Sequence, residues 1–143
     1  MNVTVLVDFD NDSSRIAVAV ADALGADLWG VRLDTSEAIV DRCLEDLGDS
    51  APRGVSIELA RRVRAALDDA GHNETRIVVS GGFDAKRITA FEEAGAPVDA
   101  YGVGSSLLQG ENDFTADVVR VGGRPCAKVG REERPNLRLE RVI

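Results

Sequence analysis

RIVVSGGFDAKRITAFEEAGAPVDAYGVGSSLL, residues 76–108, contains two short apolar strands, and each strand runs into a turn of small residues. The turns are Ser80-Gly81-Gly82 and Gly102-Val103-Gly104-Ser105-Ser106, and a helical pattern follows each of them. Glycine lets the backbone approach a ligand closely, and the first turn of a helix offers unpaired N–H groups at the positive end of its dipole. Two such turns on neighbouring parallel strands predict a cradle for one phosphate group; ordinary structural turns are the alternative.

The composition of the chain excludes some classes of partner and indicates its cellular compartment. Its 143 residues, 44% of them hydrophobic, are enough for one domain with a real core. The net charge of −8 argues against nucleic acid and anionic membranes as partners, because no basic stripe is present to neutralise phosphates. Cys43 and Cys126 lack metal-ligand or redox spacing, which is typical of a reducing cytoplasm. We find neither an apolar run long enough to span a membrane nor a signal peptide.

Hydrophobic patterns predict the remaining elements upstream of the quoted stretch. A continuous apolar run predicts a strand at 3–7, and such continuity is typical of a strand buried on both faces. The apolar stretch LWGVRL predicts a second strand at 28–33. Apolar residues at helical spacing predict helices at 15–24, 37–47, 56–70 and 84–94. With strands at 77–79 and 100–103, the order of elements is β-α-β-α-α-β-α-β.

This order predicts an α/β fold with four parallel strands. A closed (β/α) barrel has about eight strands, and the helices here suffice to cover only one face of the sheet. The sheet is therefore either open and doubly wound or part of a barrel completed by material outside the chain. We expect the second arrangement, with residues 1–110 as the C-terminal part of a (β/α) barrel. Residues 111–143 form an extension in which Gly122-Gly123 predicts an antiparallel hairpin between 114–121 and 124–129, and 137–143 are a last strand.

Polar side chains at the strand ends are the candidate site residues. Asp8 ends the first strand and opens an acidic loop, which indicates either a Mg²⁺ site or helix capping and solvation. Arg32 and Asp34 are two residues apart and point to the same side of the second strand. They contact a ligand if that side is the mouth of a barrel, or they form an internal ion pair, with each other or between Arg32 and Asp8.

Other residues have weaker claims to function. His72 is the only histidine, and its place in a turn after a helix favours a structural role. Arg53 lies in a loop, where it either grips a phosphate or is solvated. Lys86 and Arg87 lie in the first turn of a helix, where the helix dipole disfavours cations unless an anion is near. Cys43 lies on an apolar helix face and is predicted to be a small buried hydrophobe.

Five motifs carry a family resemblance that covers nearly the whole chain. The motifs are GVRLDT at 30–35, Pro52-Arg53-Gly54, VVSGGFD at 78–84, AGAPVDAYGVGSSL at 94–107 and VGGRPCAKVG at 121–130. Together they resemble nicotinate phosphoribosyltransferase, and they are most similar to the shorter forms of that enzyme. The match corresponds to the C-terminal half of that enzyme. The resemblance implies synthesis of nicotinate mononucleotide from nicotinate and 5-phosphoribosyl 1-pyrophosphate in NAD biosynthesis, with Mg²⁺ as cofactor and ATP as co-substrate.

The same resemblance implies roles for individual residues. Arg32 and Asp34 would be the catalytic residues beside the ribose and the base, and Asp34 would bind either the ribose hydroxyls or the metal, with Asp8 as a second metal candidate. The 5′-phosphate would lie between the two turns, against Ser80, Gly81, Gly82, Gly102, Gly104 and Ser105. Lys128 resembles a family lysine, although Gly130 replaces a serine found in many members. Asp8-Phe9-Asp10 departs from the family's aspartate-threonine-tyrosine run.

The N-terminal domain of the family, its first barrel strands and its phosphorylatable histidine have no counterpart here. We therefore expect little or no turnover by the chain alone. We expect the missing N-terminal half or a second copy as its partner, with homo-oligomers through the uncovered sheet. Two alternatives stay open: a non-catalytic, phosphate-binding half-barrel, and a fragment of another phosphate-binding (β/α) barrel enzyme, such as one from the histidine or tryptophan pathways. The RLDT motif and the hairpin favour the phosphoribosyltransferase over the latter.

Overall fold

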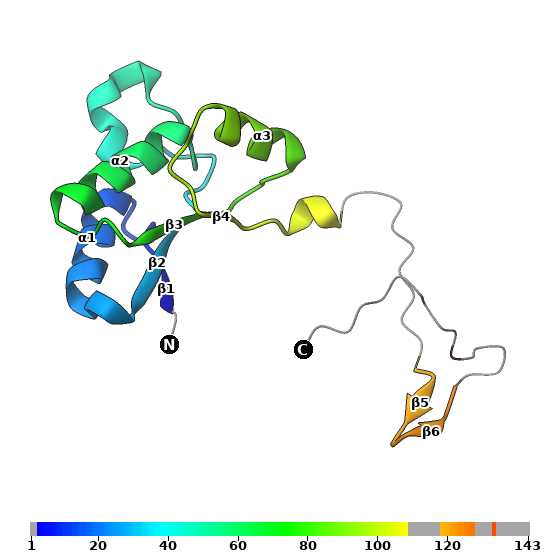
Figure 1. Cartoon of the computed structure of the whole chain (residues 1–143). Helices are drawn as coiled ribbons and strands as arrows, with labels where there is room; N and C mark the ends of the chain where they lie inside the picture. The colour runs from blue at the N-terminus through cyan, green and yellow to red at the C-terminus, as the bar shows by residue number, and fades with distance from the viewer. Residues whose placement is uncertain (1–2, 109–117, 128–132, 134–143) are drawn as a thin grey trace. The chain divides into compact units, whose positions relative to one another are not determined.

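A computed structural model describes residues 3–108, 118–127 and 133 of the chain (Figure 1). Contacts divide the chain into two units, Met1–Gln109 and Gly110–Ile143. The first unit contains a four-stranded sheet with its helices, and the second contains a two-stranded sheet. Each unit is described by itself.

The sheet of the first unit is parallel throughout. Its strands are β1 (Val3–Leu6), β2 (Leu28–Leu33), β3 (Arg76–Val79) and β4 (Ala100–Tyr101), and they lie side by side in the order of the sequence. The prediction of four parallel strands is thus confirmed. A doubly wound sheet reverses its strand order at a switch point. The described strands show no such reversal, which argues against the open, doubly wound arrangement.

The helices of this unit lie on one side of the sheet (Figure 1). They are α1 (Ser13–Leu24), α2 (Ile57–Asp69) and α3 (Ala85–Glu93), joined by the short 3₁₀ segments η1 (Gly25–Asp27), η2 (Arg42–Ser50) and η3 (Ser105–Leu107). The core lies between the helices and this face of the sheet; its fully buried members include Val7, Ala17, Val31, Leu33, Leu59, Val63, Leu67, Ile77 and Val79.

Within residues 3–108, side chains on the other face of the sheet are exposed or only partly buried, so the prediction that the first strand is buried on both faces is wrong. In β1, Val3 and Val5 are half-buried, whereas Thr4 and Leu6 are exposed, Leu6 to 48%. Leu6 lies in one row of the register with Arg32 and Val78, which are only partly buried. The reason is the one-sided helix layer: a residue on the second face has no described element to pack against.

The prediction of a helix at 37–47 is also wrong. Residues 36–41 are irregular, η2 begins at Arg42, and Gly48 interrupts it with φ 56°. Asp41 explains the difference, because it is fully buried and caps α1 from 28 residues away. Its carboxylate accepts hydrogen bonds from Ser13 N (3.2 Å), Ser13 Oγ (2.6 Å) and Cys43 N (3.1 Å).

Helix capping by the loop before α1 is one of the two alternatives that the sequence offers for this loop. Asp12 occupies the N-cap position, but its side chain makes no capping hydrogen bond and pairs with Arg15 at 2.9 Å instead. Asn11 adopts a positive φ of 55° and donates to the carbonyl of Val40 at 2.8 Å. The acidic loop is therefore bound to the segment around residue 41, which provides the cap.

The second unit contains the predicted hairpin. Strands β5 (Arg120–Val121) and β6 (Arg124–Pro125) are antiparallel, and Gly122 and Gly123 between them have φ values of 53° and 77°. Positive φ at both central residues is what a primed turn requires. The outer parts of the predicted arms and the strand at 137–143 lie outside the described residues.

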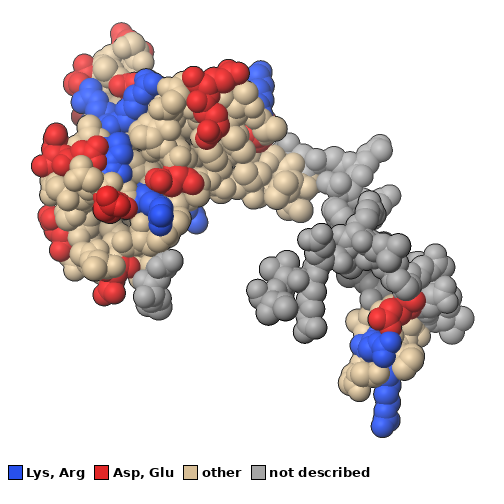
Figure 2. Space-filling view, in the orientation of Figure 1, with Lys and Arg blue, Asp and Glu red and all other residues tan. Residues whose placement is uncertain are grey.

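Acidic and basic side chains are interspersed over the visible face of residues 3–108 (Figure 2). Many of the basic groups have acidic partners, such as Arg62 with Asp46 and Arg64 with Asp68. Among the described helices, none is long and apolar enough to cross a membrane.

Candidate functional site

The carboxyl ends of β2, β3 and β4 surround a cavity of 410 Å³. Its lining consists of Arg32, Asp34, Ser80, Gly81, Gly82, Gly102, Val103, Gly104 and Ser105. Eight of these nine residues are the catalytic and phosphate-binding candidates predicted from the sequence. The structure therefore brings together, in one place, residues from three separate segments of the chain.

Strand pairing holds the two glycine-rich turns beside each other. The N–H of Ser80 donates to the carbonyl of Leu33 at 2.9 Å, and the N–H of Gly102 donates to Val79 at 2.7 Å. These bonds continue the parallel ladder just beyond the ends of β3 and β4. The Ser80 hydroxyl also donates to the carbonyl of Leu33, at 3.3 Å, so this buried side chain helps to join the end of β3 to β2.

Four N–H groups in the turns remain available to a ligand. Within residues 3–108, the backbone N–H groups of Gly81, Gly82, Gly104 and Ser105 donate to no protein acceptor. Two of them come from each turn, and all four residues line the cavity. Unpaired backbone donors in a concave, glycine-rich site are suited to an anion.

Close contacts require glycine at two positions of the cavity wall. A Cβ atom at Gly81, where φ is 90°, would lie 2.8 Å from Oδ1 of Asp34. A Cβ atom at Gly102 would lie 2.9 Å from Cβ of Ser80. Gly104 is different, since a Cβ atom there meets nothing within 4 Å. A side chain at position 104 can thus project into open space without disturbing the fold.

Arg32 and Asp34 form the ion pair that was the alternative to ligand contact. Nη2 of Arg32 lies 3.1 Å from Oδ2 of Asp34, and the two side chains are 41% and 33% exposed. A solvent-facing pair of this kind contributes little stability, so a ligand can replace one partner at small cost. Nε of Arg32 is buried and has no hydrogen-bond partner among the described residues. The ion pair and ligand contact are therefore compatible.

The metal candidates are not clustered. Asp8 lies beyond the end of β1 and is not among the residues that line the cavity, whereas Asp34 is. In the described part of the chain, no group of three or more His, Cys, Asp or Glu side chains is placed to hold a metal ion. Lys128 and Gly130 lie outside the described residues.

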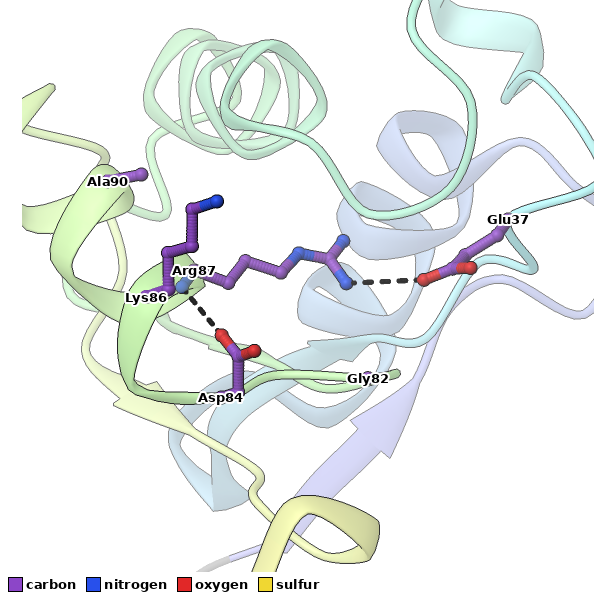
Figure 3. A pocket seen from close by; sticks show the side chains of 6 residues that line it. All are labelled: Glu37, Gly82, Asp84, Lys86, Arg87 and Ala90. Carbon is purple, nitrogen blue, oxygen red and sulfur yellow. Dashed lines mark hydrogen bonds and ion pairs between the residues drawn. The ribbon is translucent and has the colours of Figure 1, made fainter. Parts of the chain in front are cut away.

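His72, Arg53 and Arg87 have structural partners. Nε2 of His72 lies 2.8 Å from Oδ1 of Asp22, and Arg53 donates to the carbonyl of Ala38. Arg87 donates to two backbone carbonyls and does not line the cavity at the strand ends. Its side chain lines a neighbouring pocket, where it points towards Glu37 (Figure 3). The sequence did not predict these contacts; a cation in the first turn of a helix was the only signal.

Cys43 and Tyr101, which lie outside the cavity, have raised pKa values. Burial raises the pKa of the Cys43 thiol to about 11, so the half-buried thiol stays protonated near neutral pH. Burial, together with a 2.6 Å hydrogen bond to Glu92, raises the pKa of Tyr101 to about 12.

These features define an α/β protein with a parallel sheet covered on one face and a glycine-rich cavity at the carboxyl ends of its strands. No family model matches the chain. It is 40% identical over 129 residues to nicotinate phosphoribosyltransferase pncB1 of Mycobacterium tuberculosis, covering 87% of this chain and 24% of that protein. Nicotinate phosphoribosyltransferase pncB2 of the same organism is 40% identical over 61 residues, 43% of this chain and 13% of that protein.

A solved structure agrees with the sequence matches. Nicotinate-nucleotide pyrophosphorylase from Pyrococcus furiosus superposes with a TM-score of 0.61 at 35% identity, over 92% of this chain and 30% of that one. The chain spans about a quarter of the length of pncB1, less than the half that the motifs suggest. Over most of its own length, the chain is thus related to the nicotinate phosphoribosyltransferases. The family resemblance that the sequence motifs indicate is confirmed.

Proposed function

We propose that the chain is the part of a nicotinate phosphoribosyltransferase that binds the 5′-phosphate and the ribose of its substrates. The observation that supports this most is the cavity at the strand ends, which collects all eight residues predicted to carry the reaction. The chain's similarity to enzymes of that name gives the second line of support.

In the proposed reaction, nicotinate displaces pyrophosphate from 5-phosphoribosyl 1-pyrophosphate. A C–N bond forms and a C–O bond breaks at the anomeric carbon, which gains oxocarbenium character. The chain contributes by holding the phosphate on the N–H groups of Gly81, Gly82, Gly104 and Ser105, at a fixed distance from Arg32 and Asp34. Positioning and charge stabilisation, without a covalent intermediate, are the means of catalysis.

The cavity is compatible with the proposed Mg²⁺. Such ions are commonly bound through one or two carboxylates together with substrate phosphates, and Asp34 offers one accessible carboxylate on the cavity wall. When bound, Mg²⁺ would neutralise charge on the departing pyrophosphate. We also propose ATP as a co-substrate of the complete enzyme, without assigning its site to a residue of this chain.

The barrel belongs to the same proposal. Strands in sequential order, helices on one face and an uncovered second face are what a segment of a (β/α) barrel requires. We propose that further strands, from the rest of the enzyme or from a second copy, close the barrel over Leu6, Arg32 and Val78. Turnover is therefore expected from the completed enzyme and not from this chain alone.

A chimera tests the function. In pncB1 of Mycobacterium tuberculosis, the matched segment is replaced by this chain, and formation of nicotinate mononucleotide is measured. We expect activity in the chimera, its loss with Gly104→Glu, and substantial retention with Gly104→Gln, since the two side chains differ mainly in charge. A folded but inactive chimera, or equal activity of the Glu and Gln variants, would contradict the proposal.

A further inference from the structure

We propose that Arg87 positions the phosphate-binding turn by fixing the peptide group between Gly81 and Gly82. This inference rests on the proposed function. Arg87 does not line the cavity, so the role is positioning and involves no contact with the substrate.

Arg87 lies in the first turn of α3 and contacts three other parts of the chain, of which Figure 3 shows Glu37. Its Nη1 donates to the carbonyl of Gly81 at 2.6 Å, and its Nη2 donates to the carbonyl of Val55. Nη1 also lies 3.5 Å from Oε1 of Glu37. The guanidinium thus connects the glycine turn with the two loops between β2 and α2.

The planarity of the peptide group makes the contact with Gly81 informative. The carbonyl of Gly81 and the N–H of Gly82 belong to one trans peptide, so they point in opposite directions. A bond that holds this carbonyl toward Arg87 turns the Gly82 N–H away from Arg87. Gly82 lies between two pockets, since it lines the strand-end cavity with Gly81 and a neighbouring pocket with Arg87. An N–H that points away from Arg87 is therefore directed towards the strand-end cavity.

The turn needs such a restraint because of its sequence. Gly81 and Gly82 have φ values of 90° and 67°, and two consecutive glycines leave the peptide between them free to rotate in the absence of another contact. A charge-assisted hydrogen bond is stronger than one between neutral groups. Arg87 is therefore suited to select one orientation of this peptide before a phosphate arrives.

The core of the protein holds Arg87 itself in place. Its guanidinium lies 4.3 Å from the centre of the Phe83 ring. Phe83 is almost fully buried, and its ring packs against Phe91 at 5.0 Å and Tyr101 at 5.5 Å. The orientation of the peptide is thereby coupled to the aromatic cluster beneath α3.

Arg64 offers a matched control at the other end of the sheet. It also donates to two backbone carbonyls, those of Thr75 at 2.6 Å and His72 at 2.9 Å, and it is part-buried. Both contacts lie before the start of β3, away from the cavity. Loss of the two hydrogen bonds from Arg64 should lower the stability of the protein without changing the binding of a phosphate at the strand ends.

The test is an NMR titration of the 143-residue chain with nicotinate mononucleotide, which follows the amide signals of Gly82 and Ser105. In the wild type, both signals should shift. In Arg87→Met, the Gly82 shift should be lost while that of Ser105 remains, with a dissociation constant raised about tenfold, as for one net hydrogen bond. Arg87→Lys should recover part of the affinity, and Arg64→Met should lower the melting temperature and leave both shifts intact.

The outcomes separate this inference from the proposed function. If the wild type binds and Arg87→Met, still folded, shows the same Gly82 shift and affinity, Arg87 does not position the turn, and the proposed function stands. Equal loss of both shifts would mean general damage to the site and would also overturn the positioning role. Absence of binding by the wild type would overturn the proposed function and this inference together. If Arg87→Met does not fold, Arg87→Lys decides: a weakened Gly82 shift with the Ser105 shift retained supports the inference, and a Gly82 shift and affinity equal to those of the wild type overturn it.

Discussion

Gly81 is the residue whose replacement most directly tests the geometry of the cavity. We predict that Gly81→Ala lowers the free energy of unfolding by roughly 1–3 kcal/mol, because alanine is strained at a φ of 90°. Its Cβ atom would also crowd Asp34 at 2.8 Å. Urea unfolding measures the change. Gly104→Ala is the control and should be tolerated, since its Cβ atom meets nothing within 4 Å; equal losses in both variants would contradict the geometry.

Asp41 acts at the same scale but supports the fold. It is fully buried, and its carboxylate accepts hydrogen bonds from three donors, which are Ser13 N, Ser13 Oγ and Cys43 N. We predict that Asp41→Ala destabilises the protein by about 2–4 kcal/mol, since a helix cap is lost and buried donors are left unpaired. Thermal unfolding compares it with Asp12→Ala, which removes only exposed contacts with Arg15 and should have little effect. A larger loss in Asp12→Ala would show that Asp12 is the true cap.

At the scale of elements, the sequence predicts most of the structure and fails where a distant contact decides. The strand at 28–33 is confirmed at both ends, and the helices at 15–24, 56–70 and 84–94 are confirmed within two residues. The apolar residues of the segment 37–47 have helical spacing, yet Asp41 accepts hydrogen bonds from the start of α1 and Ile39 is 41% exposed. Apolar periodicity cannot report a hydrogen bond between residues 28 apart in sequence.

The site follows the same logic. The glycine and serine turns could be predicted because each directly follows an apolar strand, and the ends of parallel strands meet at one edge of a sheet. The alignment of Arg32 with Asp34 followed from their spacing of two in a strand. The contact of Arg87 with Gly81 and Val55 could not be predicted, because it depends on how α3 packs against two separate loops.

The partial burial of Cys43 in η2 predicts how stability depends on pH. Burial raises the pKa of this thiol from 9.0 to about 11, so the folded state holds the proton more tightly than the unfolded state. The stabilising effect is complete below pH 9 and is lost as the pH rises towards 11. We predict that chemical denaturation at increasing pH shows this decline and that Cys43→Ala reduces it. An identical decline in both proteins would exclude Cys43 as its source.

At the scale of the whole molecule, the uncovered face of the four-stranded sheet is the main feature. β1 and β4 are edge strands with unpaired backbone groups, and Leu6 is 48% exposed on the open face. We predict that the chain self-associates at micromolar concentration and that Leu6→Asp shifts it towards the monomer, as measured by sedimentation equilibrium. A wild-type chain that stays monomeric and melts cooperatively would show that this face needs no cover.

The central claim is that the two glycine-rich turns form one phosphate site in this chain. Calorimetric titration with nicotinate mononucleotide tests it most directly, on the wild type and on Gly104→Glu and Gly104→Gln. Position 104 accepts a side chain without steric conflict, so the two variants should fold alike and differ in the charge that they place in the cavity. We predict binding by the wild type, weaker binding by Gly104→Gln and none by Gly104→Glu. No binding by a folded wild type, or equal binding by all three proteins, would contradict the claim.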